Sequence, residues 1–218
     1  MDKRLLTYSA THLARLIRNQ DVSVFEVVDT HITYANQVNP ALNAIVVARF
    51  AEARQEARVA QSALKNGETV GPFYGVPFTL KEMIELEGYP CTMGSTYYAD
   101  ELAEEDATVV QRLRAAGAIP IGTTNQPEMA FWCESYNPIY GRTNNPHDVS
   151  RTSGGSSGGE GAIIGSGASP FGLGSDVAGS IRIPVRFPSY SVLLSRISRN
   201  HHRQTPQPRT LSRSVNSS

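Results

Sequence analysis

The sequence has few of the residues that build disulfide frameworks, metal sites or membrane spans. Cysteine occurs only twice, at Cys91 and Cys133, with no C-x-x-C pair and no other metal-ligand spacing. We therefore expect no disulfide framework and no metal site, and we interpret each cysteine as a buried free thiol. No apolar run is long enough to span a bilayer, and the first residues lack the apolar core of a signal peptide. These absences predict a cytoplasmic protein without a membrane span.

Nucleotide-binding motifs are also missing. No G-K-[ST] triplet is present, which excludes a P-loop, and no G-x-G-x-x-G follows a predicted strand within a βαβ unit. We therefore expect no nucleotide, and no organic cofactor of another kind is implied. Charged residues make up only 18% of the chain, and its 20 basic and 20 acidic side chains give a net charge of zero. No nucleic-acid partner is expected for such a chain.

Capping signals and hydrophobic periodicity predict helices that alternate with strands. Helices are predicted at 9–17, 23–40, 50–65 and 107–116, and strands at 44–48, 75–81 and 119–122. Ser23 and Glu26 form a capping box, and Pro40 is predicted to end the second helix. Gly67 is predicted to stop the third. This alternation favours an α/β fold, and 218 residues suffice for one domain with a substantial core.

Glycine and serine are densest between Thr152 and Pro184. That composition by itself would also fit a flexible linker. Apolar residues such as Ile163 and Ile181 recur through the segment, however, and this recurrence favours a packed structure. Dense glycine allows backbone N–H groups to approach a ligand closely. Such an approach is what the stabilisation of a developing oxyanion requires.

Three motifs in the chain resemble those of the amidase signature family. They are GGSSGG at 154–159, GSIRIP at 179–184 and GVPFTLKE at 75–82. Lys81 precedes Ser156 by 75 residues, and Ser156 precedes Ser180 by 24, separations similar to those in the family. The resemblance covers about residues 5–184, and residues 1–184 are assigned as the N-terminal part of an amidase-signature domain. It implies an α/β fold with a mixed sheet flanked by helices, incomplete at the C-terminus.

The resemblance implies a catalytic triad of Lys81, Ser156 and Ser180. A serine hydroxyl is a weak nucleophile until a base removes its proton. In the family, the residue that matches Lys81 takes a proton from the one that matches Ser156. That bridging serine in turn deprotonates the nucleophile, which matches Ser180. The peptide bond before Ser156 is implied to be cis.

Further residues acquire roles by the same resemblance. Ala130 and Ser156 are implied to border the substrate. Asp176 and Arg182 flank Ser180 in the sequence, and from this placement we expect them to pair and hold the nucleophile loop. The oxyanion hole is implied to consist of backbone N–H groups, those of Val177, Ala178, Gly179 and Ser180. The implied function is hydrolysis of a small carboxylic amide through an acyl-enzyme on Ser180. A glutamate after the glycine motif, here Glu160, resembles the fatty acid amide hydrolase and acetamidase branch of the family. A homodimer is a further expectation.

Three alternatives stay open at this point. GGSSG at 154–158 also fits G-x-S-x-G, the nucleophile elbow of α/β-hydrolases, which would make Ser156 the nucleophile. That fold needs a later histidine, and the chain has only His201 and His202 there. The motif could also survive in an inactive fragment. The aromatic residues around Trp132 fit either a hydrophobic core or the lining of a substrate pocket.

The resemblance stops after Pro184. Residues 185–218 are rich in arginine and serine and contain no aspartate or glutamate. This composition predicts a disordered basic tail, and a shifted reading frame would produce the same pattern. Because the family domain is considerably longer than the matching part, an inactive chain is one of the expected outcomes.

Overall fold

The computed structural model describes residues 2–68 and 70–186. Of the predicted tail, only Val185 and Arg186 are included, and residues 187–218 lie outside the described part. In chain order the elements are η1 (Lys3–Thr7), α1 (Ala10–Arg18), α2 (Val24–Leu42), β1 (Ile45–Ala48), α3 (Phe50–Lys65), β2 (Pro77–Lys81), η2 (Thr96–Tyr98), α4 (Thr108–Ala115), β3 (Ile119–Thr124), η3 (Glu128–Ala130), β4 (Tyr136–Asn137), β5 (Gly141–Arg142), α5 (Gly158–Gly165), β6 (Gly172–Leu173) and α6 (Arg182–Arg186).

Local signals place the N-terminal helices close to their predicted bounds. The Ser23 hydroxyl caps α2 by accepting a hydrogen bond from the backbone N–H of Glu26 at 3.0 Å. Gly67 follows α3 with φ of 78°, a conformation in which glycine ends helices without steric cost. The predicted stop at Pro40 is wrong, because α2 continues to Leu42. Proline removes one N–H donor, and in the last turn of a helix this loss is small enough to be tolerated.

Four strands form a mixed sheet in the order β1-β3-β2-β6. Strand β1 pairs antiparallel with β3, whereas β3 with β2 and β2 with β6 are parallel pairs. A separate hairpin joins β4 and β5. Helices accompany the sheet, so the predicted α/β class and the mixed sheet are both confirmed.

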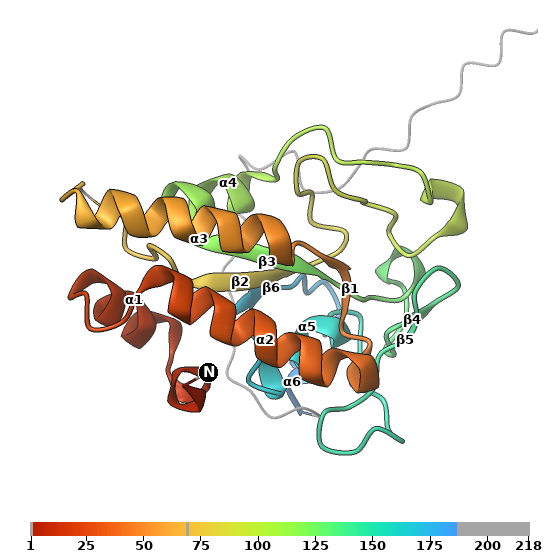
Figure 1. Cartoon of the computed structure of the whole chain (residues 1–218). Helices are drawn as coiled ribbons and strands as arrows, with labels where there is room; N and C mark the ends of the chain where they lie inside the picture. The colour runs from red at the N-terminus through yellow and green to blue at the C-terminus, as the bar shows by residue number, and fades with distance from the viewer. Residues whose placement is uncertain (1, 69, 187–218) are drawn as a thin grey trace, which may run out of the picture.

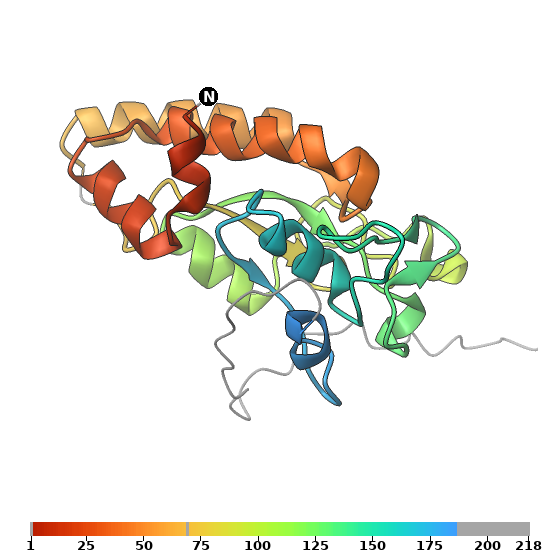
Figure 2. The same ribbon diagram turned by 90° about the horizontal axis from the view of Figure 1, so that it is seen from below.

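Helices cover both faces of the sheet. Helices α2 and α3 lie side by side across one face, as both views show (Figures 1 and 2). Their buried side chains, among them Val27 and Ala57, form a core with Ile121 of β3. Helix α4 lies on the opposite face, where Val110 packs in one cluster with Phe78 of β2. Among the described helices, none is both long and apolar enough to cross a bilayer.

An irregular register between β2 and β3 decides which side chains meet. Phe78 pairs with Pro120 but Thr79 pairs with Gly122, so one residue of β3 bulges out of the ladder. Beyond this bulge Lys81 is paired with Thr124. Because side chains alternate along a strand, Thr79 and Lys81 point to the same face. Helix α5 packs on that face, against β2 and α2.

Gly159 allows α5 to approach the sheet closely. A Cβ atom at this position would lie 2.4 Å from the backbone nitrogen of Asn125 and 2.7 Å from its oxygen. We expect Gly159→Ala to lower the free energy of unfolding by about 2 to 3 kcal/mol or more, because backbone cannot move aside as a side chain can. Urea denaturation measures this change. Gly67→Ala is the control, since its Cβ would meet nothing within 4 Å and only its positive φ carries a cost, about 1 kcal/mol. Equal losses in both variants would contradict the close approach.

Candidate active site

Lys81 ends β2 in a fully buried position. Its Nζ atom lies 2.6 Å from Ser156 Oγ and 2.9 Å from Ser175 Oγ, and it donates a hydrogen bond to each. The lysine and serine that the motif spacing singled out are therefore in direct contact. Ser175 is a further partner that the sequence did not reveal.

Ser156 lies in the turn that leads into α5. The peptide bond between Gly155 and Ser156 is cis, as the family resemblance implied. The side chain of Ser156 is buried, and its carbonyl oxygen accepts a hydrogen bond from Ser135 Oγ at 3.3 Å. Ser135 Oγ also accepts the backbone N–H of Gly158 at 2.9 Å. The backbone N–H of Ser135 donates to the Gly154 carbonyl at 3.1 Å, so Ser135 holds the turn on both sides of Ser156.

The loop that carries Ser180 is organised by Asp176. The carboxylate accepts backbone hydrogen bonds from Gly179 at 2.8 Å and from Ile181 at 3.1 Å. It also forms an ion pair with Arg182 at 2.9 Å, so the predicted pairing is confirmed. The hydrogen bond from Arg182 is the main cause that holds the pKa of Asp176 far below its usual range, and the backbone donors add to it. Asp176 therefore stays ionised and keeps the loop folded.

Ser180 itself is partly buried and lies beside the turn of Ser156. Its carbonyl oxygen accepts the backbone N–H of Ser157 at 2.9 Å, which ties the two serine segments together. Within the described residues, the Ser180 hydroxyl makes no hydrogen bond with Ser156. Catalytic hydrogen bonds often close only when substrate is bound, so this geometry is compatible with a bridging role for Ser156.

The four backbone amides of the predicted oxyanion hole differ in their partners. The N–H of Gly179 donates to Asp176. In the part of the chain that the structure describes, the N–H groups of Val177, Ala178 and Ser180 donate to no protein acceptor. The Val177 residue is 96% exposed, so this stretch of backbone is open to a ligand. Three of the four predicted donors are thus available.

Burial sets the protonation of Lys81. The loss of solvation lowers the pKa of Lys81 to about 7, although the carboxylates of Asp176 and Glu160 act in the opposite direction. An ammonium group with this pKa is neutral in about half of the molecules at pH 7. A neutral amine can accept a proton, and an ordinary surface lysine cannot do so at this pH.

Several other predictions have a clear outcome. Cys91 is buried, as predicted, and burial raises the pKa of its thiol to about 12. Cys133 is exposed, so the prediction of a buried thiol there is wrong. The aromatic residues beside it do not form a core, because Phe131, Trp132 and Tyr136 are 85%, 67% and 57% exposed. Their surroundings are polar turns and the short η3 and β4 elements, which bury little apolar surface.

Ala130 lies in the same exposed region, with φ of 58°. This left-handed conformation costs a residue with a Cβ atom about 1 to 2 kcal/mol. Residues shortly after Ala130 touch the site, because a Cβ atom at Gly155 would lie 2.8 Å from the backbone nitrogen of Glu134. The segment therefore borders the Ser156 turn, and the role of Ala130 toward substrate stays a prediction.

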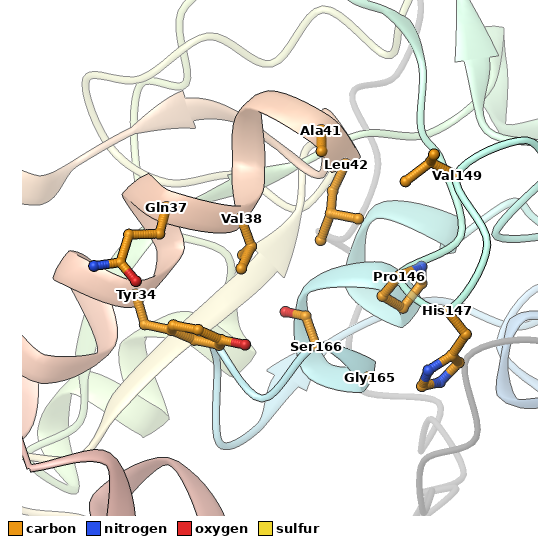
Figure 3. Close-up of a pocket in the computed structure, with 10 residues that line it drawn as sticks. All are labelled: Tyr34, Gln37, Val38, Ala41, Leu42, Pro146, His147, Val149, Gly165 and Ser166. Carbon is orange, nitrogen blue, oxygen red and sulfur yellow. The ribbon is translucent and has the colours of Figure 1, made fainter.

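A surface cavity of about 470 Å³ lies at the other end of α5 (Figure 3). It is lined by residues from α2, such as Tyr34, and by the end of α5 at Gly165 and Ser166. Lys81, Ser156 and Ser180 are not among the ten lining residues. Within residues 2–68 and 70–186, no group of three or more histidine, cysteine or acidic side chains could hold a metal ion.

The architecture and the site together indicate the class of protein to which this chain belongs. A mixed sheet between helices presents a buried lysine, bonded to a serine that follows a cis peptide bond. A profile of the amidase family matches residues 26–189. The chain belongs to the amidase family.

Individual relatives agree with this membership. Human fatty-acid amide hydrolase 2 is 45% identical over 190 residues, which are 84% of this chain and 36% of that protein. The acylamidase of Rhodococcus erythropolis is 38% identical over 183 residues, 84% of this chain and 38% of that enzyme. A solved fatty acid amide hydrolase matches with a TM-score of 0.81 and 32% identity, over 84% of this chain and 32% of that one. The chain thus spans about a third of the length of these relatives.

Proposed function

We propose that this chain hydrolyses a linear carboxylic amide through an acyl-enzyme on Ser180, with Ser156 and Lys81 as the proton relay. The observation that carries the proposal is the hydrogen bond of 2.6 Å between Lys81 Nζ and Ser156 Oγ. Membership in the amidase family supports the same reaction class. Relatives named as fatty-acid amide hydrolase and acylamidase support an amide as the substrate.

The proposed reaction has two halves. Ser180 Oγ attacks the carbonyl carbon while its proton passes to Ser156, and the proton of Ser156 passes to neutral Lys81. The backbone N–H groups at 177–180 stabilise the negative charge on the oxygen. The C–N bond then breaks, and the leaving amine takes up the proton. In the second half water attacks the ester, which releases the carboxylic acid and restores the Ser180 hydroxyl.

The Gly179 amide has a defined place in this proposal. In the structure it donates to Asp176 and so fixes the loop. The amides of Val177, Ala178 and Ser180 are the proposed first contacts of the oxyanion. Ala130 and Ser156 are proposed to border the acyl group.

A fluorophosphonate tests the proposal on the full chain. The reagent phosphonylates an activated serine with loss of fluoride, and intact-mass spectrometry detects the added group. We expect one adduct per chain, mapped to Ser180 by peptide sequencing. A folded chain that gains no adduct would contradict the proposal and favour the inactive-fragment alternative. An adduct on Ser156 would favour the nucleophile elbow instead.

Ser175 offers a more specific prediction about Lys81. Its hydroxyl is one of two side-chain partners of Lys81 Nζ. We expect Ser175→Ala to slow fluorophosphonate labelling about fivefold, since one lost hydrogen bond of about 1 kcal/mol leaves the amine less well oriented. Ser166→Ala at the far end of α5 is the control and should label at the wild-type rate. An unchanged rate in Ser175→Ala would exclude Ser175 from the orientation of the base.

Three broader expectations stay predictions of the sequence. They are the cytoplasmic location, the homodimer and the absence of a nucleic-acid partner. The division of the chain at residue 184 is likewise a proposal. Sedimentation of the purified chain would test the homodimer directly.

A further inference from the structure

A second acidic side chain lies beneath the proposed site. Glu160 occupies the first turn of α5 and is only 3% exposed. Its Oε2 atom accepts a hydrogen bond from Thr79 Oγ1 at 2.9 Å, and its Oε1 atom accepts one from Thr124 Oγ1 at 2.9 Å. Thr79 lies in β2, two residues before Lys81, and Thr124 ends β3 as the register partner of Lys81. The carboxyl group therefore links α5, the helix that follows Ser156, to β2, which carries Lys81, and to the neighbouring strand β3.

The fold has space for this carboxyl group because Gly172 has no side chain. A Cβ atom on Gly172 of β6 would lie 1.8 Å from Glu160 Oε2. Any larger residue in β6 would push the carboxyl group away from Thr79. Three strands and one helix thus meet at a single buried acid.

The hydroxyl groups around Glu160 can serve a neutral acid as well as a carboxylate. Thr79 Oγ1 also contacts Ser169 Oγ at 3.2 Å, and Ser169 Oγ donates to the carbonyl of Phe171 at 2.7 Å. Thr124 Oγ1 is 3.3 Å from the carbonyl of Leu80. Either threonine can therefore accept the one hydrogen bond that a protonated Glu160 donates and can donate its own hydroxyl hydrogen to a further acceptor, while the other threonine keeps donating to the carboxyl group.

The charges around this group are few. Lys81 is the cation that acts on Glu160, and burial raises the pKa of Glu160 to about 8. Lys81 in turn is influenced by two carboxylates, Asp176 on the nucleophile loop and Glu160 on α5. An ionised Glu160 would favour the ammonium form of Lys81 and so compete with its use as a base. A protonated Glu160 leaves Lys81 free to lose its proton.

We propose that Glu160 is a positioning residue: it clamps the first turn of α5 to β2 and β3 as a hydrogen-bonded acid, and thereby holds Ser156 against Lys81. This inference rests on the function proposed above. Glu160 touches neither the substrate nor Ser180 in this arrangement. It acts through the placement of Ser156 and through the charge that Lys81 experiences.

The test compares fluorophosphonate labelling of the full chain with that of two variants between pH 6 and 9. Glu160→Gln keeps the shape and the hydrogen bonds of the clamp but can never ionise. We expect it to label within about threefold of wild type and with the wild-type pH midpoint, because a protonated Glu160 carries no charge for the substitution to remove. A midpoint displaced by about 0.3 unit or more toward lower pH would mean that Glu160 is ionised beside Lys81, and it would overturn the hydrogen-bonded acid. Glu160→Ala removes the clamp, and we expect labelling to slow about tenfold or more.

A matched control comes from the other buried acid beside Lys81. Glu82 follows Lys81 directly, is 1% exposed, and bonds to Thr92 and Gln126 instead of to the α5 clamp. Glu82→Gln makes the same chemical change, and its pH midpoint should match that of wild type. A common displacement in both glutamine variants would overturn the specific role of Glu160.

The outcomes distinguish a failure of the proposed function from a failure of the role proposed for Glu160. An unlabelled but folded wild-type chain would refute the proposed function and, with it, this inference. A labelled wild type with a displaced midpoint in Glu160→Gln, or with the wild-type rate in Glu160→Ala, would refute the role of Glu160 alone. If Glu160→Ala does not fold, the midpoint of Glu160→Gln decides the question. A merely structural acid would change the yield of folded protein, and the folded fraction of Glu160→Ala would then label at the wild-type rate.

Discussion

Ser180→Ala is expected to abolish covalent labelling by a fluorophosphonate and turnover of simple amides. The substitution removes the only oxygen that can form the acyl-enzyme in the proposed reaction. Loss of the nucleophile in a serine hydrolase lowers the rate by about 10⁶-fold, so the intact mass of the treated variant should stay at that of the untreated chain. The fold should persist, because the structural bond of Ser180 uses its backbone carbonyl and not its hydroxyl.

A surface serine supplies the control for this experiment. Ser62 lies exposed in α3, and its hydroxyl bonds only to the carbonyl of Arg58 within its own helix. Ser62→Ala should therefore gain the adduct at the wild-type rate. An adduct that persists in Ser180→Ala would remove Ser180 from its proposed role, and peptide mapping would then identify the serine that reacts.

Lys81→Ala should slow labelling by about 10²- to 10⁴-fold, the range expected when a general base is removed. The wild-type rate should also depend on pH in a defined direction. Because burial lowers the pKa of Lys81 to about 7, the neutral and proton-accepting form grows as the pH rises through that value. The labelling rate should therefore rise from pH 6 to pH 8 and then level off.

The variant and its control distinguish the loss of the proposed base from a general effect of removing one positive charge. In Lys81→Ala the rise near pH 7 should disappear together with most of the rate. Lys65 is exposed at the end of α3, and Lys65→Ala should keep both the rate and the pH profile. A Lys81→Ala variant that labels at the wild-type rate would exclude Lys81 as the base.

The pair of Lys81 and Ser156 could be predicted from the sequence because motif and spacing resemble a known family. Strand periodicity explains the rest of the contact, since a lysine at the end of a buried strand points to one face of the sheet. The Asp176 and Arg182 pair could be predicted for a similar reason, because the two residues lie six apart around one glycine-rich turn. Local signals and motif register were sufficient in these cases.

Other features could not be predicted from the sequence, because they depend on contacts between residues that lie far apart along the chain. Pro40 was predicted to end α2, yet the helix continues to Leu42, where Asn43 closes it in the left-handed conformation. Cys133 looked like a buried thiol by residue type, although its segment lies on the surface. Glu160 gave only a weak sign of branch membership. Nothing local indicated that two threonines from different strands would hold its carboxyl group.

The sequence by itself determined the family, the α/β class, most element positions and the residue types available for chemistry. These properties reside in short motifs, capping residues and periodic side chains, which act over a few positions along the chain. Only the tertiary structure decided that Ser175 joins Lys81 and Ser156, and that a bulge in β3 places Thr124 on their face. It also decided the pKa of Lys81, since a lysine in water titrates near 10.4 and only burial among folded segments brings that value toward 7.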